Sequence, residues 1–148
     1  MKRLFVFVLI LLVMASCSHK ANKVGDILAV NGELGVVFVV TPDGQHGKVM
    51  SVTEINCNWH DAKSWSLNLG NGWKLPTKDE LLMICKNKDA INLSLQTIGY
   101  NLLGVESYWS SDVCENHEPG AWIVGMRNGN TYRYNKSDIS GVRAVSAF

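Results

Sequence analysis

The segment GNGWKLPTKDELLMIC (residues 70–85) contains a sharply defined helix start. Thr77 and Glu80 have the spacing of a capping box, in which each side chain accepts a hydrogen bond from the backbone N–H of the other. Pro76 lacks the N–H that a helix interior requires, so the helix cannot extend backwards past it. Apolar side chains then recur at helical spacing, at Leu81, Ile84 and Cys85. The segment therefore predicts a capped helix with one buried face over about residues 78–87.

Outward from this helix, the chain reads as strands, then helices, then strands again. Short apolar or alternating runs predict strands at residues 25–30, 35–40, 48–55, 121–126, 131–135 and 141–148. Residues 61–69 predict another helix. Residues 88–107 are ambiguous: Ile91, Leu95 and Ile98 have the spacing of a short helix, but glycines interrupt the pattern. Asn128-Gly129, between two of the strands, is a strong hairpin signal. This order predicts an α+β fold with a mainly antiparallel sheet and two helices.

The N-terminal residues have the pattern of an exported lipoprotein. Lys2 and Arg3 precede an apolar run of 11 residues, Leu4–Met14, which is too short to span a bilayer. We interpret residues 1–16 as a signal peptide. Met14-Ala15-Ser16-Cys17 resembles a lipobox and predicts lipidation of Cys17, with ordinary cleavage beside an incidental cysteine as the alternative. Residues 17–24 are then the lipidated cysteine and its tether, and residues 25–148 are one domain.

The segment after Cys17 also bears on localisation. It is short and polar, and no acidic run follows the cysteine. Some lipoproteins exported to the cell surface have such a run. We therefore expect an outer-membrane lipoprotein of the bacterial cell envelope that faces the periplasm.

The charge balance and the motif content narrow the function. Removing residues 1–16 takes Lys2 and Arg3 from the 14 basic side chains, so 12 remain against 13 acidic ones. This balance, without a basic stripe, argues against nucleic acid as a partner. The sequence has no His-Glu-x-x-His, Gly-x-Ser-x-Gly or Cys-x-x-Cys pattern. We expect a non-catalytic protein with no cofactor and no metal ion.

Three cysteines follow Cys17 in the sequence: Cys57, Cys85 and Cys114. An oxidising cell envelope permits one disulfide among them. Cys57 precedes the first predicted helix and Cys85 ends the second, so a Cys57–Cys85 pair is one prediction. Three buried thiols that behave as small apolar side chains are the equal alternative.

Four segments together resemble the Lcl C-terminal-like domain family. They are GWKLPTKDEL (residues 72–81), YWSSD (108–112), AWIVGMRNG (121–129) and GVRAVSAF (141–148). The resemblance covers about residues 35–148, and it implies a C-type-lectin-like fold, which is common in bacterial lipoproteins and adhesins. It also implies that Trp73 and Leu75 lie in the core. We expect Trp109 and Trp122 there too because a tryptophan buries a large area, with stacking of their rings on a sugar as the alternative.

The same broad fold includes enzymes and calcium-dependent lectins. The sulfatase-modifying enzymes need a reactive cysteine pair late in the domain, where this chain has only Cys114. Calcium-dependent lectins use a Glu-Pro-Asn loop, and Glu118-Pro119-Gly120 lacks the oxygen ligand of the asparagine. Neither chemistry is therefore predicted, and fold alone does not decide function.

The resemblance and the polar loops together predict a lipid-anchored binding protein of the cell envelope. Its ligand would be a glycan or an envelope protein, with a structural subunit of an envelope or fimbrial assembly as the alternative. The candidate ligand-binding residues lie in two loops and the strand after them: Asp112, Asn116, Glu118, Arg127, Asn128, Tyr132 and Tyr134.

Overall fold

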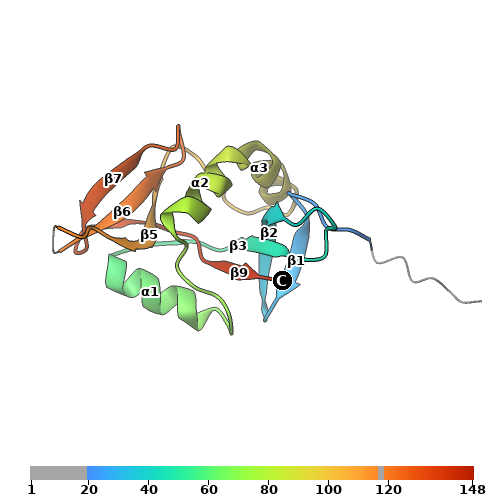
Figure 1. The fold of residues 1–148 in the computed structure, drawn as a ribbon, viewed down its shortest axis with the longest axis horizontal. Helices are drawn as coiled ribbons and strands as arrows, with labels where there is room; N and C mark the ends of the chain where they lie inside the picture. Colours follow the sequence, from blue (N-terminus) through green and yellow to red (C-terminus); the bar gives the residue numbers. More distant parts are fainter. Residues whose placement is uncertain (1–19, 117–118) are drawn as a thin grey trace, which may run out of the picture.

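The computed structural model describes residues 20–116 and 119–148, which form nine strands and three helices (Figure 1). The elements are β1 (Ile27–Val30), β2 (Glu33–Val40), β3 (Gly47–Ser51), β4 (Ile55–Cys57), α1 (Trp59–Asn68), α2 (Lys78–Lys86), α3 (Lys88–Thr97), β5 (Ser107–Val113), β6 (Gly120–Gly125), β7 (Thr131–Asn135), β8 (Ser140–Val142) and β9 (Val145–Ala147). The α+β prediction is confirmed. The predicted signal peptide, Cys17 and Glu118 lie outside the described residues.

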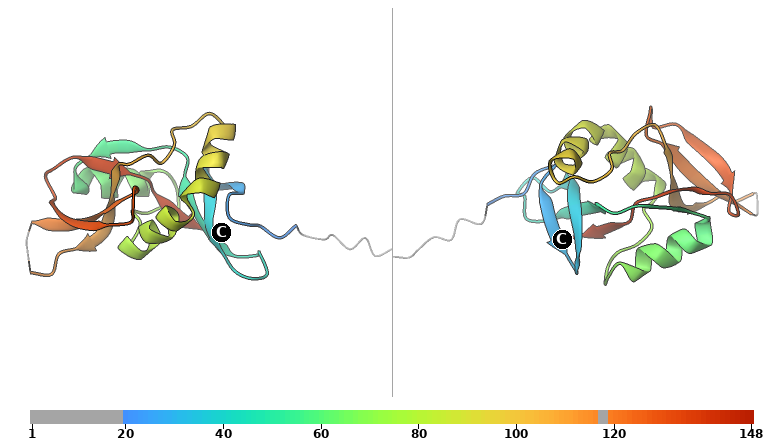
Figure 2. Two further views of the ribbon diagram at one scale, coloured as in Figure 1. Left: turned by 90° about the horizontal axis from the view of Figure 1, so that it is seen from above. Right: turned by 180° about the vertical axis from the view of Figure 1, so that it is seen from behind.

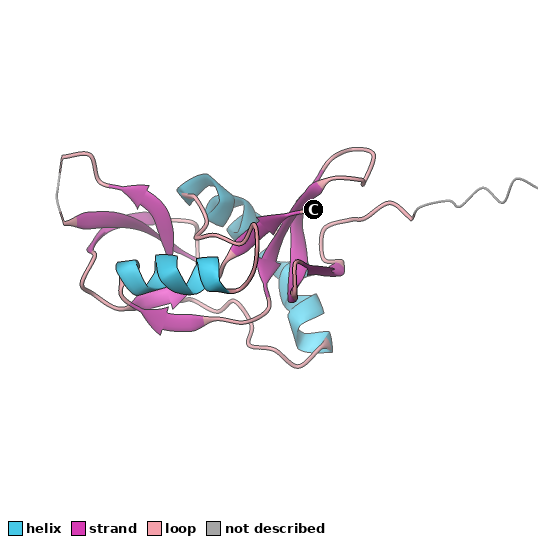
Figure 3. Ribbon diagram, turned by 90° about the horizontal axis from the view of Figure 1, so that it is seen from below, coloured by secondary structure: helices cyan, strands magenta, loops and turns pink. Residues whose placement is uncertain are grey.

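The strands form two sheets, where the sequence predicted one. The first sheet has the order β1-β2-β3-β9 and the second the order β4-β8-β5-β6-β7, and they lie at opposite ends of the long axis (Figures 1 and 3). Two predicted strands are each divided between the sheets: residues 48–55 become β3 and β4, and residues 141–148 contribute to β8 and β9. The chain therefore crosses between the sheets at both places, which a period-2 pattern cannot reveal.

The segment that predicts the helix start has the expected geometry. The Thr77 hydroxyl accepts a hydrogen bond from the Glu80 N–H at 3.1 Å, and the Glu80 carboxylate accepts one from the Thr77 N–H at 2.8 Å. Before this cap, Trp73 and Leu75 are 1% and 4% exposed, as the family resemblance implied. Lys74, between them, forms a two-hydrogen-bond bridge with Val145 of β9. The segment thus connects the helix start to the last strand of the first sheet.

Helix α3 is the element that the sequence pattern left undecided. It begins one residue after α2, at a position where Asn87 makes no side-chain cap for it. Ile91 and Leu95 are fully buried in the same core cluster as Leu81 and Ile84 of α2. The described part of the chain therefore has three helices where two were predicted, and tertiary packing rather than a local start signal stabilises the third.

The helices cover opposite faces of the strands, with α1 on one side and α2 and α3 on the other (Figure 2). In the second sheet, successive side chains of a strand point alternately to α1 and to α2. Trp109 and Ile123 pack with α1, and Tyr108 and Val124 pack with α2. None of the described helices is both long and apolar enough to cross a membrane.

The predicted Cys57–Cys85 disulfide is not formed, since all three described cysteines are free thiols. Cys57 packs beside α1, whereas the Cys85 sulfur lies 3.7 Å from the carbonyl oxygen of Met126 in a different core cluster. Burial, together with the charge of Asp61, raises the pKa of the Cys57 thiol. The alternative prediction of three buried thiols holds for Cys114, whereas Cys57 and Cys85 are half-buried and pack against the core clusters.

The buried carboxylate of Glu80 predicts a pH-dependent stability. Burial by itself would raise its pKa, but hydrogen bonds from the Lys48 ammonium at 2.7 Å and from the Thr77 N–H outweigh burial and lower the pKa below the usual 4.5. The ionised carboxylate therefore stabilises the fold above about pH 4.5, and this contribution is lost as the pH falls through the lowered pKa. Glu80→Gln is expected to lower the free energy of unfolding at pH 7 by about 1.5–3 kcal/mol.

Urea unfolding of both proteins at pH 7 and at pH 3 checks this expectation. The difference between wild type and Glu80→Gln should shrink at the lower pH, because Glu80 is then protonated in the unfolded state and its charge no longer stabilises the fold in full. Glu106→Gln, at an exposed position, is the matched control and should change little at either pH. A difference that stayed constant with pH would show that the Glu80 charge does not stabilise the fold.

Candidate binding site

A cleft of about 580 Å³ opens where the start of α2 meets the end of β5 and the strands β6 and β7. Its walls combine an indole, cationic side chains and acidic or amide side chains. The lining residues are Thr77, Lys78, Asp79, Asp112, Val113, Cys114, Glu115, Asn116, Trp122 and Arg133. An aromatic surface with a few convergent polar groups is typical of a ligand site.

Two hydrogen bonds join the start of α2 to β5 beside the cleft. The Ser111 N–H donates to the Pro76 carbonyl at 2.7 Å, and the Lys78 N–H donates to the Asp112 carboxylate at 2.5 Å. Asp112 thus accepts a hydrogen bond from the first residue of the helix, where a negative charge is favoured. Asp112 was predicted to lie in a binding loop; it lies near the end of β5, and one of its oxygens has this structural role.

Trp122 is the aromatic side chain of the cleft. The Lys78 ammonium lies 4.8 Å from the centroid of its ring, and the Arg133 guanidinium carbon lies 5.5 Å from it. Both distances are within the range of cation–π interactions. Trp122 is partly exposed, so its expected core position was wrong, whereas Trp109 is fully buried as expected. The two cations hold the indole in place while part of its surface faces the cleft.

The structure separates the predicted site residues into three places. Asp112 and Asn116 line the cleft. Arg127 and Asn128 lie in the turn between β6 and β7, where the Asn128 side chain accepts a hydrogen bond from the Asn130 N–H. The remaining described pair lies on the opposite face of β7 from Arg133: Tyr132 and Tyr134 are 46% and 38% exposed.

The cation–π group of the cleft, which consists of Lys78, Trp122 and Arg133, was not among the predicted ligand-binding residues. Sugar stacking by Trp122 was only the alternative to its expected core position. A usable signal was present in the hairpin. Trp122 and Arg133 are directly opposite each other in the β6–β7 register. Side chains alternate between the two faces of a strand, so a shift of the pairing by two residues would still leave Trp122 and Arg133 on the same face. The Asn-Gly turn and this alternation therefore suffice to predict an aromatic side chain beside a cation. Lys78 has no such signal, because its position follows from the packing of α2 on β5.

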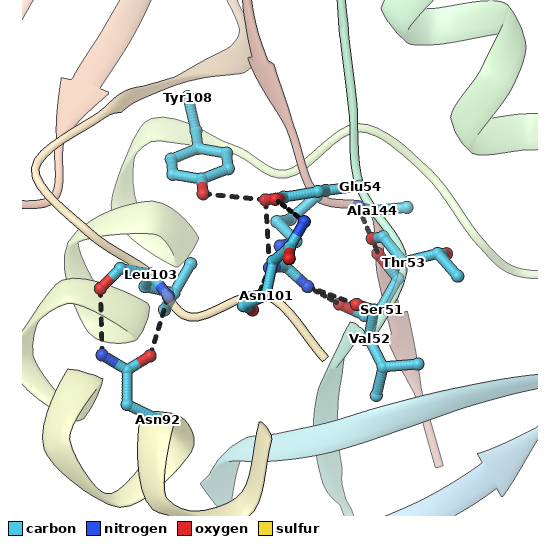
Figure 4. Close-up of polar contacts among 10 residues, drawn as sticks. Ser51, Val52, Thr53, Glu54, Asn92, Asn101, Leu103, Tyr108 and Ala144 are labelled. Carbon is cyan, nitrogen blue, oxygen red and sulfur yellow. Dashed lines mark hydrogen bonds and ion pairs between the residues drawn. The ribbon is translucent and has the colours of Figure 1, made fainter. Parts of the chain in front are cut away.

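A second polar cluster lies between the sheets and contains the fully buried Arg143. Figure 4 labels other members of this cluster, including Glu54, Asn101 and Tyr108. The Arg143 guanidinium donates to the backbone carbonyls of Ser51, Val52 and Asn101, and it pairs with the Glu54 carboxylate at 3.0 Å. The Tyr108 hydroxyl donates to the same carboxylate at 3.0 Å. Burial and the negative charge of Glu54 raise the pKa of Tyr108, so its proton stays in place. These bonds connect β3, β5 and the segment between β8 and β9, so this cluster stabilises the fold.

Metal ligands are not concentrated in either cluster. Within residues 20–116 and 119–148, no group of three or more histidine, cysteine, aspartate or glutamate side chains is placed to hold a metal ion. The lining of the cleft combines acidic side chains with the cations of Lys78 and Arg133. The cleft is therefore suited to direct contact with a polar ligand.

A comparison with models of protein families identifies the family of this chain. The model of the Lcl C-terminal domain matches residues 34–146, which includes both sheets from β2 onward, all three helices and the cleft. The chain belongs to the Lcl C-terminal domain family. No curated protein matches it. Four segments of this Lcl C-terminal domain contribute to its three core clusters and to the cleft between α2 and the second sheet. They are the quoted helix start, the strand of Trp109, the strand of Trp122 and the segment around Arg143.

Proposed function

We propose that this chain is a lipid-anchored binding protein of the cell envelope that takes a glycan into the Trp122 cleft. The carrying observation is the partly exposed indole of Trp122, which is fixed by two cations beside hydrogen-bonding side chains. An aromatic face packs against the C–H face of a sugar ring, and neighbouring amide, carboxylate and cationic groups bond its hydroxyls. Asn116, Glu115 and Arg133 are exposed and provide such groups.

The position of the cleft supports this proposal. The first described residues leave the domain beside β1 and β2, whereas β5, β6 and β7 lie at the far end of the long axis (Figures 1 and 2). Asn22 is already bonded to the Gly44 carbonyl through its backbone and side-chain N–H groups. Asn22 is only five positions after Cys17 in the sequence, a reach of at most about 18 Å. A domain anchored at Cys17 would thus lie close to the membrane, with the cleft at the end away from the anchor.

A glycan array probed with purified residues 18–148 tests the proposal. Trp122→Ala is expected to lower the affinity for any bound glycan about ten-fold or more, because the stacking surface is removed. Tyr134→Ala, on the other face of the sheet, is the matched control and should bind like the wild type. EDTA should leave binding unchanged, since the proposed contacts are direct.

Each alternative result has a definite meaning. Loss of binding in EDTA would move the site to a metal held by the loop that contains Glu118. Equal binding by wild type and Trp122→Ala would remove the cleft as the glycan site. A complete absence of glycan binding would favour the second candidate function, a subunit of an envelope or fimbrial assembly, for which the open edge of β7 is the specific observation.

A further inference from the structure

Strand β7 is an open edge of the second sheet. It is the last strand in the order β4-β8-β5-β6-β7, and β6 is its one neighbour there. All five of its residues are exposed, in contrast to the largely buried β5 and β6. Figure 1 shows β7 at the outer margin of the domain. The opposite edge strand, β4, has only three residues.

The register of the hairpin shows which backbone groups of β7 face outward. The Gly125 N–H bonds the Asn130 carbonyl, and the Lys136 N–H bonds the Pro119 carbonyl, both at 2.9 Å. Because hydrogen-bonded pairs alternate in an antiparallel ladder, the even-numbered residues of β7 bond to β6. The N–H and C=O groups of Thr131 and Arg133 therefore point away from the sheet, and within the described residues they have no hydrogen-bond partner. Such a row is a template for another strand.

The charge on this edge disfavours pairing with a second copy. The strand, TYRYN, has Arg133 at its centre and no acidic side chain. A symmetric antiparallel pair of two β7 strands would place Arg133 opposite Arg133, and like charges directly opposite each other destabilise a sheet. The same position favours a carboxylate on the incoming strand.

We propose that β7 binds an extended segment of a partner protein as an added strand, with an acidic residue of that segment opposite Arg133. The residues on either side of the acidic one would then lie on the other face, beside Tyr132 and Tyr134. Tyr132, Tyr134 and Ile139 are exposed there by 46%, 38% and 61%. The recognised pattern is therefore apolar–acidic–apolar. Backbone bonds give affinity and the alternating contacts give specificity. The inference does not depend on glycan binding in the cleft.

Thr131→Pro tests the backbone part of this proposal. The Thr131 N–H points outward, so proline removes one free donor without breaking the β6 ladder, and edge strands tolerate proline. Random heptapeptides displayed on phage are selected on immobilised residues 18–148, and the enriched peptides are synthesised. They should contain the apolar–acidic–apolar pattern and bind Thr131→Pro about ten-fold more weakly than wild type. Thr131→Ala, which keeps the N–H, is the control and should bind like wild type.

Arg133→Glu tests the charge part and remains informative if the proline variant does not fold. It should lose about ten-fold in affinity for the acidic peptide and recover it when the acidic residue of the peptide is replaced by lysine. Failure to enrich any peptide, or equal binding by wild type and both variants, would overturn the proposal. A dimer of the free protein that disappears in Thr131→Pro would assign the edge to a second copy instead. Thr131→Pro should leave glycan binding unchanged, so the two proposals fail separately.

Discussion

Replacing Arg143 by methionine is expected to lower the free energy of unfolding by about 3–5 kcal/mol. The guanidinium is fully buried between the sheets and serves three backbone carbonyls and the Glu54 carboxylate. Methionine fills much of the same volume but donates no hydrogen bond. The loss should lie near the lower end of the range, because the Glu54 side chain is 22% exposed and water can reach it.

Urea unfolding monitored by circular dichroism measures this effect. Arg127→Met, in the exposed turn between β6 and β7, is the matched control and should change the free energy of unfolding by less than about 0.5 kcal/mol. Adding Glu54→Gln to Arg143→Met should recover part of the loss, because no unpaired carboxylate is then left behind. A loss below about 1 kcal/mol for Arg143→Met would mean that the cluster does not hold the sheets together.

Arg143 also illustrates which parts of the fold could be predicted from the sequence. The capped helix α2 and the β6–β7 hairpin depend on interactions between residues a few positions apart, so Thr77, Glu80 and Asn128-Gly129 predicted them correctly. The family motif that contains Arg143 was recognised, but its division into β8 and β9 was not. That division depends on which strand each half meets, β4 and β5 for one and β3 for the other.

The candidate site was predicted in part for the same reason. Asp112 and Asn116 were found because the polar loop after β5 is local in sequence. Lys78, Trp122 and Arg133 come from three separate elements and meet only when α2 packs on the second sheet. The expected burial of Trp122 was wrong because its face of the sheet is covered by α2 only further along, at Tyr108 and Val124. The local sequence pattern predicts on which face of the sheet a side chain lies. It does not predict how far along that face a helix such as α2 extends.

The other large effect is expected for Trp73→Ala, within the segment that starts α2. Trp73 is 1% exposed and packs against Val30, Val37, Val49 and Ala144. Its indole N–H donates to the Val30 carbonyl at 2.9 Å. Removing the ring leaves a cavity between the first sheet and the segment that leads into α2. We expect the free energy of unfolding to fall by about 3–5 kcal/mol.

Trp122→Ala is the matched control, since it is the same chemical change at a partly exposed position and should cost about 1 kcal/mol. Trp73→Phe should lie between the two, because it keeps most of the buried ring but leaves the Val30 carbonyl without its donor. Far-UV circular dichroism in urea compares all three without relying on tryptophan fluorescence. Equal losses at Trp73 and Trp122 would show that the GNGWKLP segment does not anchor the first sheet. If the loss in free energy of unfolding is largest for Trp73→Ala, intermediate for Trp73→Phe and smallest for Trp122→Ala, residues 70–76 have two roles. They fill the core through Trp73, and they position the Thr77 cap of α2 beside the cleft.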